Sequence, residues 1–157
     1  MTKRIFTDCE AALAPFMDAH CHAHGAFVAG RGVALVECDD ERKTADIVAG
    51  VWYEGFNGAN LNIHLAAVPG SQWLTRELLW FAFHYAFEQC GAKRLTGLVE
   101  ESNHAARRLD EHLGFTLETR LKDAAPSGVM LVYVMRREDC KWLNLRRRGL
   151  PAMKKEH

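Results

Sequence analysis

Residues 62–99 read NIHLAAVPGSQWLTRELLWFAFHYAFEQCGAKRLTGLV, and they contain the clearest succession of secondary-structure signals in the chain. Residues 62–68 are mostly apolar, which predicts a strand, and Pro69-Gly70 predicts a turn directly after it. The long apolar segment from about residue 73 to residue 90 predicts a helix, and residues 94–99 predict a second strand. Strand, turn, helix and strand in this order form a parallel crossover unit, whose turn presents unpaired backbone N–H groups at a helix N-terminus. The stretch therefore predicts a place that can hold a phosphate.

The segments around this unit predict further strands on both sides of it. These strands, joined to their neighbours by short connections, are residues 32–38, 46–53, 115–121 and 129–135. Residues 103–113 have apolar side chains at helical spacing and are followed by Gly114, a residue typical of helix ends. Thr7 and Glu10 form a capping-box pattern before another helical segment, in which Pro15 should kink or split the helix. The strands before the crossover unit predict an antiparallel meander that leads into it.

The central helix is apolar around most of its circumference. Its polar side chains form a narrow stripe of Glu77, His84 and Glu88. A helix of this kind is buried on more than one side. It is therefore central to the domain, or it also contacts a partner subunit through Trp80. The second alternative would make the protein a homodimer.

The composition is typical of one soluble globular domain. The chain has 157 residues, of which 48% are hydrophobic and 25% are charged, so residues 1–157 are expected to form a single domain. Charged residues interrupt the longest apolar segment, and no signal-type run appears at the start. We therefore expect no membrane partner and a cytoplasmic location. The five cysteines are odd in number and widely spaced, which favours reduced thiols.

The charge is unevenly spread along the chain. Residues 136–157 carry eight Lys or Arg against three Asp or Glu, and a basic tail starts at about residue 143. Such a tail could touch nucleic acid or an acidic partner, but the sequence favours a solvated terminus, because no nucleic-acid-binding fold accompanies it. Residues 18–24 are dense in histidine. A closed metal site usually takes its ligands from two separate elements, so we expect no metal.

The order of the elements and two pieces of sequence carry a family resemblance. The pieces are residues 85–95, YAFEQCGAKRL, and residues 103–115, which start at Asn103 and end in Leu-Gly-Phe. Over residues 7–142 the chain resembles the GNAT superfamily of acyl-CoA N-acyltransferases. Both pieces look like the branch that contains the ribosomal-protein N-terminal acetyltransferases, and the chain is also similar to small acetyltransferase-like proteins of tailed phages. The resemblance implies an α/β fold, more narrowly α+β, with a mixed, mostly antiparallel sheet and a central parallel strand-helix-strand unit flanked by helices.

The resemblance also implies that acetyl-CoA is the co-substrate and that no metal takes part. In the family, the turn after the central strand holds the coenzyme pyrophosphate. The matching residues here are Ser71, Gln72, Trp73, Leu74, Thr75 and Arg76. The chain departs from the family motif, because Gly70 is the single glycine and Ser71 and Trp73 stand where the family has two. A Cβ at such a position crowds the phosphate, although backbone N–H groups and the helix dipole remain available. An ordinary helix start is the alternative.

Three more residues are implied in coenzyme binding. Asn103 matches the family position whose side chain meets the coenzyme, and a simple helix N-cap explains the same residue equally well. The backbone N–H groups of Leu65 or Ala66 are expected to polarise the thioester carbonyl.

His64 is the predicted catalytic base. It stands in the middle of the central strand, and the strand period places its side chain on one face with Asn62 and Ala66. Imidazole changes its charge near neutral pH, where a general base works best. A buried neutral histidine bonded to a backbone carbonyl is the alternative. No tyrosine stands in residues 109–111, where many family members carry a general acid. Tyr133 on the last strand could lie nearby, although an aromatic residue there is more often part of the core.

The primary functional prediction is an acetyl-CoA-dependent N-acetyltransferase acting on a primary amine, either a peptide N-terminus or a small molecule. At pH 7 an α-amine is roughly one-tenth neutral, whereas a lysine amine is neutral in well under about one part in a thousand. A weak base therefore serves an amine of low pKa more readily. The single-glycine turn and the missing tyrosine leave a non-catalytic binding module of the same fold as an alternative. Binding of nucleic acid or of an acidic partner through the basic tail is a third functional hypothesis.

Overall fold

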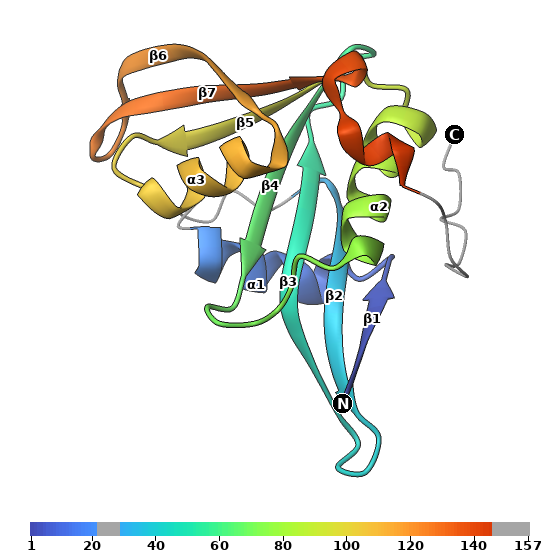
Figure 1. Ribbon diagram of the computed structural model, residues 1–157. Coiled ribbons are helices and arrows are strands. Elements are labelled where there is room, and N and C mark those ends of the chain that lie inside the picture. The colour runs from blue at the N-terminus through green and yellow to red at the C-terminus, as the bar shows by residue number, and fades with distance from the viewer. Residues whose placement is uncertain (22–28, 146–157) are drawn as a thin grey trace.

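The computed structural model describes residues 1–21 and 29–145. Seven strands form one sheet in the order β1-β2-β3-β4-β5-β7-β6 (Figure 1). The strands are β1 Thr2–Phe6, β2 Arg31–Asp39, β3 Thr44–Glu54, β4 Asn60–Ala67, β5 Arg94–Glu100, β6 Thr116–Ala125 and β7 Gly128–Arg136. The α-helices are α1 Glu10–Cys21, α2 Arg76–His84 and α3 His104–Leu113. A π-helical turn, Tyr85–Gln89, continues α2, and two 3-10 turns, Arg137–Asp139 and Lys141–Asn144, follow β7.

All neighbouring strands pair antiparallel except β4 and β5, which are parallel. The connection between these two strands contains α2, so β4, α2 and β5 form the parallel unit that the sequence predicts. The prediction of a mixed, mostly antiparallel α+β sheet is confirmed.

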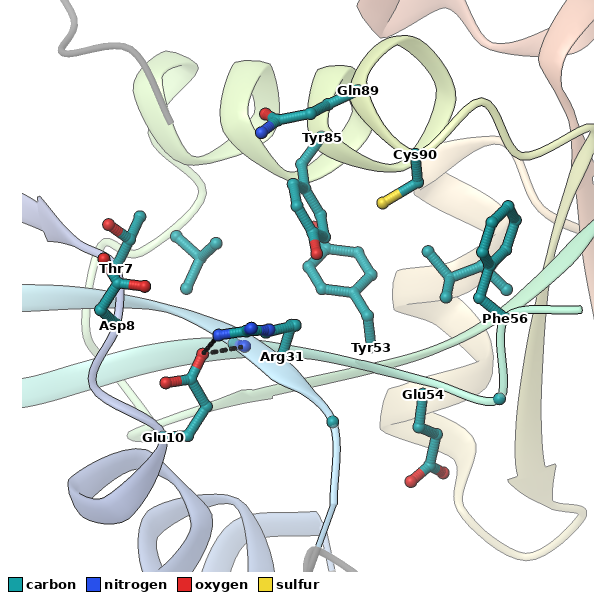
Figure 2. Close-up of a pocket in the computed structure, with 15 residues that line it drawn as sticks. Thr7, Asp8, Glu10, Arg31, Tyr53, Glu54, Phe56, Tyr85, Gln89 and Cys90 are labelled. Atoms are coloured by element: carbon teal, nitrogen blue, oxygen red, sulfur yellow. Dashed lines mark hydrogen bonds and ion pairs between the residues drawn. The ribbon is translucent and has the colours of Figure 1, made fainter. Parts of the chain in front are cut away.

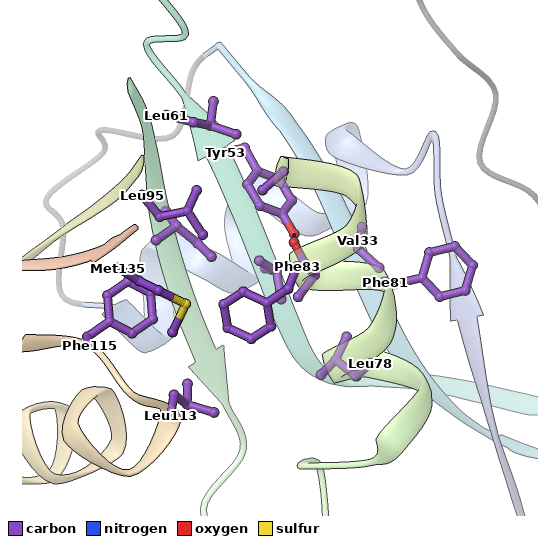
Figure 3. Packing of buried hydrophobic residues seen from close by; sticks show 14 of the residues in the cluster. Val33, Tyr53, Leu61, Leu78, Phe81, Phe83, Leu95, Leu113, Phe115 and Met135 are labelled. Carbon is purple, nitrogen blue, oxygen red and sulfur yellow. Dashed lines mark hydrogen bonds between the residues drawn. The ribbon is translucent and has the colours of Figure 1, made fainter. Parts of the chain in front are cut away.

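The helices cover the two faces of the sheet unequally. α2 and α3 lie on one face and α1 lies on the other (Figure 1). The larger core fills the space under α2 and α3, where the rings of Phe83 and Phe115 lie 6.4 Å apart between centroids (Figure 3). On the other face, α1 buries Leu13 and Met17 fully. It sits close to β3 because Gly50 has no side chain, and a Cβ there would lie 2.6 Å from Leu13 Cδ1.

The start of the chain differs from the sequence prediction. β1 pairs with β2 and was not predicted, because five residues that include Lys3 and Arg4 carry little strand pattern. The predicted capping box is wrong: α1 begins at Glu10, whose carboxylate accepts a hydrogen bond from the Gly32 N–H at 3.2 Å. The predicted split at Pro15 is also wrong, since α1 continues through it. The burial of Leu13 and Met17, on either side of the proline, offsets the loss of the one helix hydrogen bond that the proline removes.

The start of α2 also requires a correction. The helix begins at Arg76 rather than at about residue 73, and Thr75 is its N-cap, with Oγ1 accepting from the Leu78 N–H at 3.2 Å. The Thr75 N–H itself donates to the Trp73 carbonyl at 2.7 Å. Competition from this side-chain cap keeps the preceding residues out of the helix.

The end of the long apolar segment is not α-helical as predicted. From Tyr85 the chain forms a π-helical turn, closed by the bond from the Cys90 N–H to the Tyr85 carbonyl at 2.8 Å. Such turns insert one residue into the helix and shift the side chains that follow.

Some expectations concern residues outside the described ranges. His22 and His24 of the histidine-rich segment lie there, as does the chain from residue 146 on, which holds most of the predicted basic tail. Within residues 1–21 and 29–145, no group of three or more His, Cys, Asp or Glu side chains is placed to hold a metal ion. No helix of the same ranges is long and apolar enough to cross a membrane. All five cysteines are free thiols.

Candidate active site

β4 and β5 separate after three paired positions. Their ladder runs from Asn60 opposite Arg94 to Asn62 opposite Thr96. Beyond it β4 continues to Ala67, while β5 diverges from β4 and pairs with β7 alone (Figure 1). We call the opening between the diverging strands the fork. It leaves one edge of β4 in the middle of the sheet without a neighbouring strand.

The register between β4 and β3 decides which backbone groups face the fork. The Val68 N–H donates to the Val48 carbonyl at 2.8 Å, and hydrogen-bonded pairs recur at every second residue of an antiparallel ladder. Ala66 is therefore bonded to β3, whereas the N–H and C=O of Leu65 point into the fork. Of the two N–H groups predicted to polarise a thioester, only that of Leu65 faces the fork.

A contact from α1 agrees with this orientation. The Cys21 thiol, at the end of α1, donates to the Leu65 carbonyl at 3.5 Å. Burial raises the pKa of the Cys21 thiol to about 12, so it stays protonated at neutral pH and can only donate here. The contact brings the end of α1 to the fork on the face opposite α2 and α3.

His64 lies on this α1 face and is held by a carboxylate that the sequence analysis missed. Its Nε2 lies 2.7 Å from Oε1 of Glu54, and the two side chains are 20% and 27% exposed. Glu54 ends β3, and Trp52, two residues before it, stands opposite His64 in the register. A carboxylate on Nε2 favours the tautomer with the proton there, so that the lone pair is on Nδ1. The predicted base therefore has the orienting partner that such a role requires.

The turn before α2 presents unused backbone donors and a cation. Among the described residues, no acceptor takes the N–H groups of Arg76 and Glu77, which point out of the first turn of α2. Lys3 of β1 donates from Nζ to the Gln72 carbonyl at 2.7 Å, which places an ammonium group at the turn. Sequence reasoning missed Lys3 because it did not find β1.

The two side chains that replace the family glycines do not project from the turn into solvent. Ser71 Oγ donates to the Val68 carbonyl at 2.6 Å, so this side chain turns back onto β4. Trp73 is half-buried against the main core. Gln72 and Leu74, by contrast, are exposed. The substitutions therefore leave the helix N-terminus open.

Asn103 is the N-cap of α3. Its Oδ1 accepts a hydrogen bond from the Ala106 N–H at 3.2 Å. This bond alone explains an asparagine at the position, and the side-chain NH₂ group takes no part in it.

Asp110 of α3 is the one charged residue that is buried among those described. It is 9% exposed, and no described residue donates a hydrogen bond to its carboxylate. A Cβ on Gly97 would lie 3.6 Å from Asp110 Oδ2 and 3.9 Å from the Ile63 carbonyl oxygen. Gly97 and Ile63 are the first residues beyond the β4–β5 ladder, so the carboxyl group lies at the closed end of the fork. Sequence reasoning did not single it out.

Tyr133 is fully buried in the core, and its hydroxyl donates to Glu111 Oε1 at 2.9 Å. It stands opposite Gly97 in the β5–β7 register. Its burial confirms the sequence-based expectation of a core aromatic.

No protein-family model matches this sequence, and no curated protein does. Known structures do match. A spermidine N-acetyltransferase variant from Vibrio cholerae gives a TM-score of 0.64 at 16% identity, covering 90% of this chain and 96% of that chain. The yncA protein of Salmonella typhimurium, solved with its cofactor acetyl-CoA, gives a TM-score of 0.61 at 17% identity, and the match covers 87% of this chain and 94% of that chain. A GNAT-family acetyltransferase from Bacillus anthracis gives a TM-score of 0.54 at 15% identity, and the match covers 68% of this chain and 66% of that chain.

The chain has the GNAT acetyltransferase fold. At these identities the likeness concerns the path of the chain, and the roles of individual side chains rest on the geometry described above.

A separate hollow of about 400 Å³ lies in this GNAT fold beside the π-helical turn (Figure 2). Tyr53, Tyr85 and Cys90 line it, together with an ion pair at 3.9 Å between Glu10 and Arg31. Glu54 borders it, but its side chain points away from the hollow in Figure 2, toward the opposite face. None of the residues predicted for the coenzyme or for the base lines this hollow.

The buried carboxyl group predicts a pH-dependent stability. Burial, and secondly the charge of Glu111, raises the pKa of Asp110 from 3.8 to about 7. The folded chain therefore holds this proton where the unfolded chain has lost it, and the free energy of unfolding falls as pH rises through that window, by about 1.4 kcal/mol per unit of pH. Asp110→Asn cannot ionise, so its melting temperature should exceed that of the wild type near about pH 8, and the difference should shrink toward about pH 5.

Thermal unfolding at the two pH values tests this. Asp46→Asn, on an exposed part of β3, is the matched control and should show no such pH-dependent gain. Equal melting temperatures of Asp110→Asn and wild type at the higher pH would show that the carboxyl group is not held in an unfavourable environment.

Proposed function

We propose that this protein is an acetyl-CoA-dependent N-acetyltransferase that transfers an acetyl group to a primary amine. The observation that carries the proposal is the fork, where the N–H of Leu65 faces an opening in the middle of the sheet. A backbone N–H fixed in this way is suited to a carbonyl oxygen that gains negative charge during acyl transfer. The overall match to a structure with acetyl-CoA bound supports the same co-substrate.

The coenzyme arm is assigned to the face that carries α2 and α3. The N–H groups of Arg76 and Glu77, the dipole of α2 and the ammonium group of Lys3 can together bind the pyrophosphate. Asn103 stands at the start of the other helix on that face, and its NH₂ group can donate to the pantetheine arm. The thioester then reaches the fork next to Leu65.

The acceptor amine is assigned to the other face. His64, oriented by Glu54, accepts the proton that the amine must lose, directly or through one water. A single imidazole is a modest base, which suits an amine of low pKa such as a peptide N-terminus or a small-molecule amine. The resemblance to the ribosomal-protein N-terminal acetyltransferases favours the peptide N-terminus among these amines. A binding module that has lost catalysis is the alternative, and the coenzyme and turnover experiments below separate the two.

The assignment of the pyrophosphate to the backbone donors of α2 can be tested by substitution at Arg76. Arg76→Pro removes the first N–H of the helix, where proline is tolerated, and Thr75 already has the extended backbone (ψ 152°) that a following proline requires. Arg76→Ala is the matched control, because it removes the same charge and keeps the N–H. Since a hydrogen bond to a charged group contributes about 1.5–3 kcal/mol, Arg76→Pro should bind acetyl-CoA roughly 10- to 100-fold more weakly than Arg76→Ala.

Isothermal titration calorimetry measures both affinities. Equal dissociation constants for the two variants, with both folded, would remove this N–H from the coenzyme site. If titration of the wild type with acetyl-CoA gave no saturable heat, the protein would not bind the coenzyme and the proposed function would be wrong.

The assignment of His64 as the base predicts a loss of turnover when the imidazole is removed. His64→Gln keeps a polar side chain of similar size but cannot accept the proton, so kcat should fall on the order of 10²- to 10⁴-fold while the dissociation constant of acetyl-CoA stays unchanged. His112→Gln, on an exposed part of α3, is the matched control and should retain wild-type turnover. The measurement is thiol release from acetyl-CoA over a panel of peptide N-termini and small amines. Normal turnover of His64→Gln with an unchanged pH profile would make His64 a structural residue.

A further inference from the structure

A chain of side-chain hydrogen bonds crosses the sheet from β6 to β4. Arg94 of β5 donates to both carboxylate oxygens of Glu118, at 3.2 and 2.7 Å. Its Nε donates to Thr96 Oγ1 at 3.3 Å, and the Thr96 hydroxyl donates to Asn60 Oδ1 at 2.5 Å. Asn60 Nδ2 in turn donates to Asn62 Oδ1 at 3.0 Å. The chain therefore ends at the side-chain NH₂ group of Asn62.

The direction of this chain is set from Arg94. A guanidinium N–H can only donate, whereas a hydroxyl can accept one hydrogen bond and donate its own proton. Thr96 passes its proton to the amide oxygen of Asn60, which turns the NH₂ group of Asn60 toward Asn62. The oxygen of Asn62 is thereby used, and among the described residues no acceptor takes its NH₂ group, although the side chain is half-buried. Asn62 thus offers a fixed hydrogen-bond donor to a ligand.

This free NH₂ group lies at the closed end of the fork. Asn62 stands opposite Thr96 at the last pair of the β4–β5 ladder. It shares one face of β4 with His64, and the two residues start about 6.6 Å apart, because a strand rises about 3.3 Å per residue. Gly55 keeps the space beside the NH₂ group open, since a Cβ on this residue would lie 2.9 Å from Asn62 Nδ2. A molecule whose amine reaches His64 can therefore reach this donor with a second polar group.

We propose that Asn62 is the specificity-determining residue for the acceptor, and that its NH₂ group donates a hydrogen bond to a carbonyl group on the carbon that carries the amine; this inference rests on the proposed acetyl transfer. The N-terminal residue of a peptide has such a carbonyl group, and a simple alkyl amine has none. The preferred acceptors are therefore peptide N-termini and amino-acid amides. Because the neighbouring side chains hold the donor in one orientation beforehand, little side-chain entropy is lost when the acceptor binds.

A purely structural role of Asn62 predicts a different result. The same hydrogen bonds also join β4 to β5 across their short ladder. If they served only to hold the strands together, loss of the Asn62 side chain would affect acceptors with and without a carbonyl group alike.

The test compares two acceptors that differ in the carbonyl group, alanine amide and isopropylamine. The readout is the ratio of their kcat/KM values, in which a general loosening of the fork cancels. Asn62→Ala should lower this ratio about 3- to 10-fold, as expected for one neutral hydrogen bond. Asn62→Asp, which keeps the oxygen that accepts from Asn60 but has no NH₂ group, should lower it at least as much. Asn144→Ala, on an exposed part of the chain, is the matched control and should leave the ratio unchanged.

A second readout does not depend on turnover. In the ¹⁵N-labelled wild type saturated with coenzyme A, alanine amide should move the side-chain NH₂ signals of Asn62 saturably, and isopropylamine at the same concentrations should move them much less. The NH₂ signals of Asn144 serve as the reference. Equal ratios in the wild type and both Asn62 variants would overturn the inference, as would Asn62 signals that respond to neither amine or equally to both. If the wild type acetylates no amine, the proposed acetyl transfer fails, and the NMR titration alone decides whether Asn62 binds the carbonyl group.

Discussion

The structure depends on how few residues β4 shares with β5. β4 pairs with β3 from Asn62 to Ala67, but it pairs with β5 at three positions only. A strand edge without a partner in the middle of a sheet leaves backbone donors and acceptors unsatisfied, which is costly unless another group meets them. Here the Cys21 thiol meets the Leu65 carbonyl, while no residue in the described part of the chain accepts a hydrogen bond from the Leu65 N–H. The sheet topology itself therefore creates the opening in which we propose that the thioester binds.

The two faces of the fork differ in chemistry because different elements cover them. On the α1 face, the end of β3 brings a carboxylate to His64 and gives the imidazole a fixed orientation. On the opposite face, α3 brings the Asp110 carboxyl group, to which no described residue donates a hydrogen bond, over Gly97, and α2 begins with two exposed residues, Arg76 and Glu77. An imidazole and a carboxyl group thus stand on opposite faces of one opening, and the protonation of each depends on its immediate surroundings.

Much of this arrangement could be predicted from sequence, and the failures have physical causes. The crossover unit and the meander were predicted correctly because strand and helix periods are local signals. The partnership of Glu54 with His64 was not, since it depends on the register across residues 55–59, which composition does not fix. Asp110 had a signal that was overlooked: at four residues from Ala106 and three from Leu113 it lies on the inward face of α3. The start of α2 was misplaced because the Thr75 cap competes with helix propensity.

If the fork and the start of α2 form one coenzyme site, amide chemical-shift mapping should show both responding to acetyl-CoA. On titration of the ¹⁵N-labelled protein with acetyl-CoA, we expect saturable shifts, with one common dissociation constant, at the amides of Leu65, Arg76 and Glu77. The amides of the π-helical turn, Tyr85–Gln89, should move little, because that turn borders the separate hollow. Saturable shifts centred on that turn, with the Leu65 amide unmoved, would place the coenzyme in the separate hollow instead of the fork.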